Sequence, residues 1–221
     1  MPTISKENYL KAVYSQSLEQ QTEATTSVLS EKLEVSNAAI SDMAKKLSNA
    51  GLIDYTKYKG VELTGEGKKI ALKIIRRHRL WELFLIKVLG LSWSEVHDEA
   101  EKLEHSTSDF LIDKIDDFLE NPKFDPHGDP IPNKNGTLPK LPELLNMKDA
   151  EIGKSYYVRR VNDKNNDLMN YLTQIGLVLL KEIEIVDKLS FDGSIIVKVD
   201  SVNHLLSEFV ASHIFLGRKN K

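Results

Sequence analysis

Histidine and glutamate residues recur at helical spacing in the middle of this 221-residue chain. His78 and Glu82 are four residues apart. Four further residues follow at positions i, i+4, i+7 and i+8, namely His97, Glu101, Glu104 and His105. On α-helices these intervals place the first pair one turn apart and the other four on one face. Imidazole nitrogen and carboxylate oxygen bind divalent metals, so the spacing predicts two helices whose six ligand side chains face a shared space.

The composition limits which ligands and which classes of protein are available. The chain has no cysteine, 41% hydrophobic residues, 29% charged residues and a formal net charge of −3. Absence of cysteine excludes disulfides, thiolate zinc sites and cysteine nucleophiles. The sequence contains no run of about 18 apolar residues, which a membrane-spanning helix would need. The first residues also lack the apolar core of a signal peptide. We therefore expect a cytoplasmic protein that does not interact with membranes.

Net charge does not decide whether the chain binds DNA, because it averages over unlike regions. Acidic residues dominate over residues 92–129, whereas the first eighty residues are close to balanced and contain local clusters of lysine and arginine. The local field matters more than the total for contact with phosphates. The charge balance thus neither supports nor excludes a nucleic-acid partner.

The first 64 residues have the pattern of a winged helix-turn-helix. Apolar residues at helical period, with Thr25 or Thr26 and Ser36 or Asn37 as N-caps, predict three helices, and a two-stranded hairpin follows. The expected ranges are helices over 4–18 and 37–49 and strands over 52–56 and 61–64, with a short helix between the first two whose buried side is Val28, Leu29 and Leu33. The helix over 37–49 would be the recognition helix in the major groove of DNA.

Several side chains of this region suit contact with DNA. The start of the recognition helix is small and polar, which allows close approach to base edges, and its alanine methyl groups can touch thymine. The start of the preceding helix suits phosphates, and the hairpin tip is basic and aromatic. The alternative is an ordinary helical hairpin, against which the wing argues. The candidate DNA contacts are Thr26, Ser27, Ser36, Asn37, Ala38, Ala39, Ser41, Lys45, Lys57, Tyr58 and Lys59.

Three further helices are expected after the hairpin. Thr64 can cap a long helix over 66–89, and Ser92 with Glu95 forms a capping-box pattern that predicts a second helix from Trp93 through His105. A third, over 108–119, is expected to carry one apolar side, made of Phe110, Leu111, Ile115, Phe118 and Leu119. Wide apolar faces on so few residues are hard to bury within one chain, which predicts a homodimer interface.

The remainder of the chain changes character. Residues 121–144 are rich in proline, glycine, asparagine and lysine, as in a loop and linker. Alternation typical of strands follows over 153–161, 182–188 and 194–199, with a short helix over 167–175 and a tail that suits a strand or a helix. A small SH3-like barrel accounts for this pattern. The fold class expected is therefore mainly α with α+β parts.

Three domains follow from these elements. We expect a winged helix-turn-helix over 1–72, a helical metal-binding and dimerisation domain with a proline-rich linker over 73–145, and an SH3-like domain over 146–221.

Five segments of the sequence, taken together, resemble one known family: ENYLKAVY, VSNAAISDMAKKL, RRHRLWELFLIKVLGL, VHDEAEKLEH and FDPHGDPIP. The chain resembles the diphtheria-toxin-repressor / manganese-transport-regulator family of metal-dependent transcriptional repressors, and its C-terminal region is similar to the FeoA-type domain of three-domain members. The resemblance implies a homodimer that binds double-stranded operator DNA when metal is plentiful and represses genes for metal uptake.

The resemblance also implies two sets of metal ligands. They are an ancillary set, His78, Glu82 and His97, and a primary set that controls DNA binding, Glu101, Glu104 and His105. The first-helix ligand of relatives falls on Asn8, whose amide oxygen is a weaker ligand than a carboxylate, and the neighbouring Glu7 is an alternative. Glu101 stands where the iron-responsive branch has cysteine, as in the manganese-responsive branch. Metal would tie the first helix to the dimerisation helices and so set the spacing of the two recognition helices.

The donor set bears on the identity of the metal. Oxygen and imidazole ligands without thiolate favour Mn(II) or Fe(II) over Cu(I). Since the Irving–Williams order still ranks Zn(II) above Mn(II), selectivity must come from coordination number and availability. We expect Mn(II), with Fe(II) second, other divalent transition metals in vitro, and no organic cofactor.

Other interpretations of the same residues are weaker. A single His/Glu pair at i, i+4 is usually a surface pair, and His127, His204 and His213 are expected to be structural or surface residues without a ligand cluster. A helical-bundle metalloenzyme needs two Glu-x-x-His motifs, and the sequence contains none, so an enzyme is not expected. A winged-helix regulator that senses a small organic ligand would leave the His/Glu cluster without a purpose.

Overall fold

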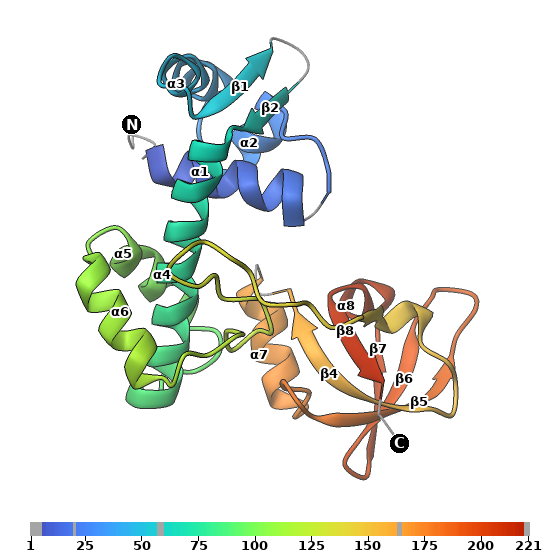
Figure 1. Cartoon of the computed structure of the whole chain (residues 1–221). Helices are drawn as coiled ribbons and strands as arrows, with labels where there is room; N and C mark the ends of the chain where they lie inside the picture. Colours follow the sequence, from blue (N-terminus) through green and yellow to red (C-terminus); the bar gives the residue numbers. More distant parts are fainter. Residues whose placement is uncertain (1–5, 20, 57–59, 163–164, 219–221) are drawn as a thin grey trace. The chain divides into compact units, whose positions relative to one another are not determined.

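The computed structural model describes residues 6–19, 21–56, 60–162 and 165–218 (Figure 1). The chain divides into two compact units, Met1–His78 with Pro132–Thr137 and Arg79–Ile131 with Leu138–Lys221. The domain limits expected from the sequence, after residues 72 and 145, stay a prediction. Among the described residues, no helix combines the length and apolar character needed to cross a membrane.

The first unit contains the expected three helices and hairpin. Its elements are α1 Lys6–Tyr14, a π-helical turn Ser15–Glu19, α2 Thr26–Lys32, α3 Asn37–Asn49, β1 Ile53–Thr56, β2 Gly60–Leu63 and the start of α4 Gly65–Leu89. The strands are antiparallel, with Ile53 opposite Leu63. Thr25 and Ser36 cap α2 and α3 by accepting from backbone N–H groups three residues later, as their positions predicted.

The hairpin packs closely on the start of α4. A Cβ at Gly67 would lie 1.9 Å from the carbonyl oxygen of Leu52, so only glycine fits this crossing. Thr64 caps the helix through the N–H of Gly67 at 3.2 Å. Tyr9, Leu29 and Ile40 are fully buried beneath these elements. Helix α3, the predicted recognition helix, therefore rests on a packed core.

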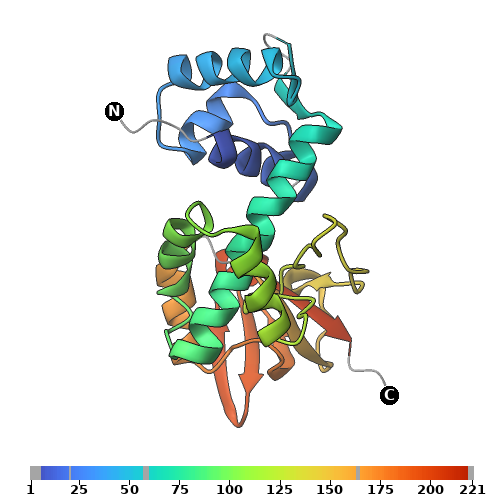
Figure 2. The same ribbon diagram turned by 60° about the vertical axis from the view of Figure 1, so that its left-hand side comes forward.

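Helices α5, Val96–Glu104, and α6, Asp109–Phe118, lie beside the second half of α4 (Figures 1 and 2). The prediction that α5 begins at Trp93 is wrong. The predicted contact between Ser92 and Glu95 is present, since the Glu95 carboxylate accepts the backbone N–H of Ser92 at 2.8 Å. The backbone N–H of Glu95, however, donates to the Ser92 carbonyl at 3.1 Å and closes a turn before the helix. Because α5 starts at Val96, the helix contains nine residues.

The apolar residues of α6 divide between two faces. Ile112 and Ile115 are buried in a cluster with Leu80 and Leu83 of α4. Residues predicted to share their face, Phe110, Leu111 and Phe118, are exposed. The single apolar side expected from the sequence is therefore wrong, because buried positions recur at i, i+3 and i+7 and leave these three outside.

The C-terminal part of the second unit is built on a six-stranded antiparallel sheet of order β3-β8-β4-β5-β6-β7. The strands are β3 Leu145–Asn146, β4 Ser155–Val161, β5 Glu182–Lys188, β6 Ile195–Val199, β7 Val202–Leu206 and β8 Ile214–Arg218. A 3-10 turn, Met147–Asp149, and helices α7 Asn166–Gln174 and α8 Glu208–Ser212 complete it. The tail contains both a helix and strands, where the sequence left the choice open.

Candidate metal centre

Two histidines and a glutamate come together where α4 meets the start of α5. His78 and Glu82 are one turn apart on α4, and His97 is the second residue of α5. One ligand atom from each lies within 4.8 Å of the others, and His97 Nδ1 is 3.3 Å from Glu82 Oε1. Glu82 has no exposed surface and His78 is 5% exposed. Two imidazoles around a buried carboxylate form a donor set that suits a divalent transition metal.

A lysine of the first helix orients one of these histidines. The ammonium of Lys11 on α1 lies 3.1 Å from His78 Nδ1. An ammonium only donates hydrogen bonds, so Nδ1 is the acceptor of this contact. The contact therefore links helix α1 to one of the three side chains of the candidate centre.

The other predicted ligands lie toward the far end of α5. Glu104 is 1% exposed, and its Oε1 is 3.4 Å from His105 Nε2. Glu101 is exposed and lies 4.0 Å from the ring of His97. Among the described residues, these three do not form a further group of ligand atoms within 4.8 Å.

The six side chains therefore do not share one space, contrary to the expectation from their spacing. Residues 97 and 105 are eight positions apart, or about 12 Å along an α-helix, which is too far for one ion to reach both. The structure separates a cluster made by His78, Glu82 and His97 from a pair at the C-terminal end, Glu104 and His105.

A second group around Glu82 was missed in the sequence. Glu82, Asp125 and His127 also place ligand atoms within 4.8 Å, and all three are buried. His127 Nδ1 lies 3.8 Å from Glu82 Oε2. The expectation that His127 has no ligand cluster is wrong, because a tight loop after α6 returns it to α4. The segment FDPHGDPIP carried the signal, since its aspartates can cap a turn.

Asp125 holds that loop together. Its Oδ1 accepts the backbone N–H groups of His127 and Asp129 at 2.8 and 2.9 Å, and its Oδ2 lies 3.5 Å from Arg79 Nε. Burial, and then the nearby carboxylates of Asp129 and Glu82, raise the pKa of Asp125 well above its usual value. Asp125 therefore has a structural role in the loop besides its place beside Glu82.

Comparisons with known proteins cover all three parts of the chain. Residues 1–61 match the family model "Iron dependent repressor, N-terminal DNA binding domain", residues 64–133 match "Iron dependent repressor, metal binding and dimerisation domain", and residues 145–217 match "FeoA domain". The iron-dependent repressor IdeR of Mycobacterium leprae is 30% identical over 184 residues, which cover 78% of this chain and 79% of the relative.

The chain belongs to the diphtheria-toxin-repressor / manganese-transport-regulator family. The HTH-type regulator MntR of Oceanobacillus iheyensis is 36% identical over 125 residues, which cover 57% of this chain and 84% of the relative. A solved manganese-dependent transcriptional repressor in complex with manganese superposes with a TM-score of 0.88 at 35% identity, covering 97% of this chain and all of that one. The protein is a metal-dependent, DNA-binding transcriptional repressor, as its homologues are repressors and not enzymes.

The helices predicted to contact DNA present small residues at the surface. Asn37 and Ala38 at the start of α3 are exposed, as is Ser27 on α2, while Thr26 is half-buried. The hydroxyl of Ser36 is engaged as the N-cap of α3. Half-buried Ala39 and Ser41 and exposed Lys45 follow on the same helix, and Lys57, Tyr58 and Lys59 lie outside the described residues.

Asn8 and Glu7 on α1 are the side chains predicted to supply a first-helix ligand. Asn8 and Glu7 are half-buried on α1 and belong to the first unit, whereas Glu101, Glu104 and His105 belong to the second. Their participation in a metal site stays a prediction.

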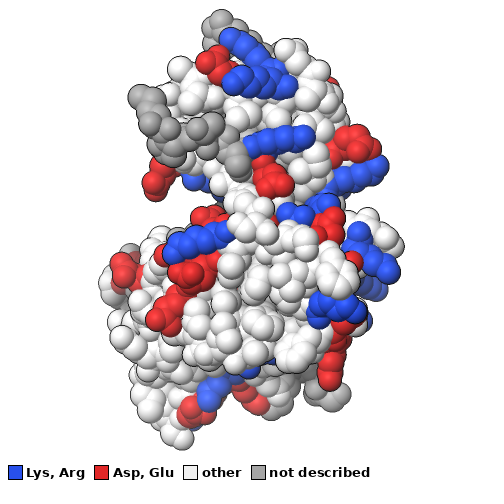
Figure 3. All heavy atoms as spheres, turned by 90° about the vertical axis from the view of Figure 1, so that its left-hand side faces the viewer, with Lys and Arg blue, Asp and Glu red and all other residues white. Residues whose placement is uncertain are grey.

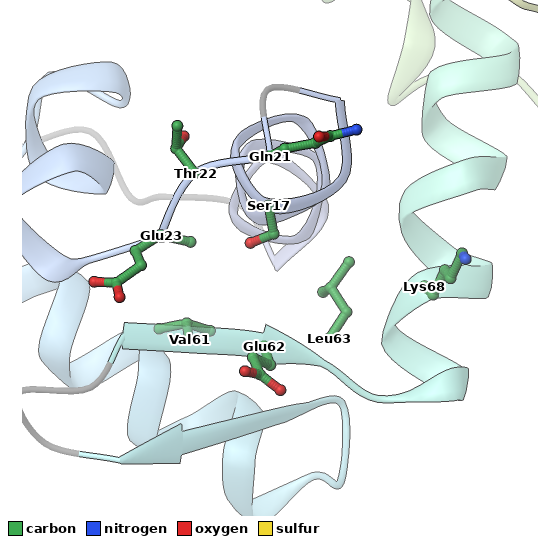
Figure 4. A pocket seen from close by; sticks show the side chains of 9 residues that line it. Ser17, Gln21, Thr22, Glu23, Val61, Glu62, Leu63 and Lys68 are labelled. Atoms are coloured by element: carbon green, nitrogen blue, oxygen red, sulfur yellow. The ribbon is translucent and has the colours of Figure 1, made fainter.

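A cavity of about 570 Å³ lies beside β2 in the winged unit (Figure 4). Its lining includes Gln21, Glu23 and Lys68, whose side chains are directed away from one another. Small-molecule sites usually have convergent polar groups. This hollow therefore gives no support to the alternative of a regulator that senses an organic ligand.

Proposed function

We propose that Mn(II) activates this repressor for operator binding, with Fe(II) as the second candidate, and that it represses genes for metal uptake. The observation that carries the proposal is the cluster of His78, Glu82 and His97, on helices within the part of the chain matched by the metal-binding model. Nitrogen and oxygen donors without a thiolate favour these harder ions over Cu(I). A similar repressor was solved in complex with manganese, which supports Mn(II) as the first candidate. The relative from Mycobacterium leprae is an iron-dependent repressor, which supports Fe(II) as the second.

We assign the two ends of α5 to different tasks. The cluster at its start would hold an ancillary ion, and Glu101, Glu104 and His105 at its end would hold the ion that controls DNA binding, completed by Asn8 or Glu7. A bound divalent ion would supply positive charge that draws these anionic and imidazole groups together. Since DNA binding and metal binding are coupled equilibria, each raises the affinity of the other by the same factor, typically about 5- to 150-fold.

The repressor is expected to act as a homodimer through α4 and α6. Phe110 and Phe118 of α6 are 74% and 65% exposed, and Leu89 at the end of α4 is 59% exposed. The face that carries α5 and α6 shows a broad area without charged residues (Figure 3). An apolar area of this kind on a family with a dimerisation domain is suited to self-association.

Binding of a manganese-transporter promoter fragment tests the proposed activation. Gel shifts at fixed salt concentration would compare the protein without metal and with Mn(II), with Fe(II) under anaerobic conditions, and with Zn(II). We expect Mn(II) to give the largest gain in affinity at ion concentrations that occur in cells. Equal affinity with and without metal would contradict the proposal, and a larger gain with Fe(II) would exchange the first and second candidates.

Sedimentation of a Phe118→Glu variant tests the dimer face. A carboxylate at the centre of an apolar interface loses hydration without gaining a partner, so we expect a monomer that remains folded. Glu120→Lys, an exposed charge change just beyond the same helix, is the matched control and should remain dimeric. A dimer of unchanged affinity in Phe118→Glu would remove α6 from the interface.

A further inference from the structure

The hydrogen bond from Lys11 to His78 joins two helices whose backbones are fixed by packing. Lys11 is half-buried on α1, where Leu10 and Val13 on either side of it in the sequence have no exposed surface. His78 lies on α4 and is 5% exposed. The ammonium Nζ of Lys11 is 3.1 Å from His78 Nδ1. Because both backbones are held in place, only the lysine side chain has to be ordered for this bond to form.

This bond determines which ring nitrogen of His78 carries the proton. A lysine ammonium has N–H donors and no acceptor, so Nδ1 must offer its lone pair to Lys11. A neutral imidazole has one N–H, which therefore lies on Nε2. While the bond to Lys11 is present, neither ring nitrogen of His78 has a lone pair available for a metal ion.

The bond to Lys11 and the binding of an ion by His78 therefore exclude each other. If Nδ1 is the ligand atom, its lone pair is no longer available to the ammonium. If Nε2 is the ligand atom, the ring proton has to lie on Nδ1, and two donors would then face each other. In both cases the Lys11 ammonium has to leave His78 before the ring can bind an ion.

We propose that Lys11 competes with the metal ion for His78 and so lowers the affinity of the His78/Glu82/His97 cluster. The proposal rests on the proposed function, since it takes this cluster to bind an ion. A hydrogen bond that involves a charged group typically changes an equilibrium constant about ten-fold or more. The sign of the effect separates this role from that of a residue that orients a ligand, whose loss weakens metal binding.

Calorimetric titration with Mn(II) tests the competition. The parent is the full-length protein with His105→Ala, in which binding at the other end of α5 is weakened. Lys11→Met keeps an unbranched apolar side chain and removes the ammonium, and we expect it to bind Mn(II) at the cluster about ten-fold more tightly or better. Lys11→Arg keeps the positive charge and the N–H donors and should retain the parental affinity.

The matched control separates the hydrogen bond from general repulsion between positive charges. Lys6→Met removes an exposed lysine from the start of the same helix and changes the net charge equally, so it should titrate like the parent. Unchanged or weaker Mn(II) binding in Lys11→Met would overturn the proposal. An equal gain in Lys6→Met, or a gain in Lys11→Arg as large as in Lys11→Met, would also overturn it.

Nitrogen NMR of histidine-labelled wild-type protein, freed of metal with a chelator, provides a readout that does not depend on affinity. His78 should show a bare Nδ1 and a protonated Nε2, with its signals identified by their absence in His78→Asn. A proton on Nδ1 would overturn the proposal. If His97→Ala titrates like its parent, no ion binds the cluster and the proposal is wrong, whereas operator binding by the wild type with and without Mn(II) decides the proposed function separately.

Discussion

The two ends of helix α5 offer a comparison between a prearranged and an open group of ligands. At the start, His97 faces a glutamate with no exposed surface, and a third ligand atom lies within 4.8 Å. At the end, Glu104 is buried beside His105, but Glu101 remains exposed and the three do not converge. A prearranged site gains little from a conformational change, whereas an incomplete one couples binding to rearrangement. We therefore expect the end of the helix to regulate and its start to stabilise.

The largest effect should come from the open end. His105→Ala removes one of the ligands proposed for the regulatory ion. We expect the metal-dependent gain in operator affinity, about 5- to 150-fold, to be lost while the protein remains folded and dimeric. Fluorescence anisotropy with labelled operator measures it. Glu99→Ala, an exposed residue of the same helix paired with Lys102, is the control and should respond like wild type.

Retention of full metal stimulation in His105→Ala would assign regulation elsewhere and break the comparison. The same anisotropy measurement on Glu104→Ala tests whether the neighbouring proposed ligand is also needed for metal-stimulated operator binding. A buried carboxylate is removed there, so circular dichroism must show that the variant is folded before its operator binding is compared.

A smaller effect is expected at the prearranged end. His97→Ala should lower the number of tightly bound Mn(II) ions by one per subunit and reduce the metal-dependent rise in Tm, because an ion bound only to the folded state stabilises it. Operator binding at saturating Mn(II) should change by less than in His105→Ala. Calorimetry and thermal melts with and without metal measure this, and complete loss of the operator response would reverse the two assignments.

The smallest effect concerns the anchoring of the open end. Trp81 of α4 donates to Thr107 Oγ1 at 2.7 Å, and the Thr107 hydroxyl donates to the carbonyl oxygen of Leu103 at 2.6 Å. Thr107→Val keeps the shape and removes both bonds, which should cost about 1–3 kcal/mol because the indole N–H is left without this acceptor. Chemical denaturation measures the loss. In a His97→Ala background, where Mn(II) binding at the start of α5 is removed and the titration measures binding at its end, Thr107→Val should lower Mn(II) affinity. Unchanged affinity there would show that this anchoring has no part in metal binding.

Much of the fold follows from local signals in the sequence. Thr25, Ser36 and Ser108 each precede a helix and accept a backbone N–H three residues later, so those helix starts depend on nearby residues alone. The family model matches bear out the three parts of the fold class as well. The predicted capping-box contact between Ser92 and Glu95 is present, but the backbone N–H of Glu95 donates to the Ser92 carbonyl at 3.1 Å and closes a separate turn, so α5 begins only at Val96.

The sequence by itself determined which ligands are available, since a chain without cysteine that spaces histidine and glutamate by helical turns can present only imidazole and carboxylate there. Only the tertiary structure decided how they are grouped. The length of α5 separates His97 from His105, and the loop after α6 brings His127 back to Glu82 across 45 positions of sequence. Periodicity describes neighbours on one helix, whereas contacts between distant segments depend on packing.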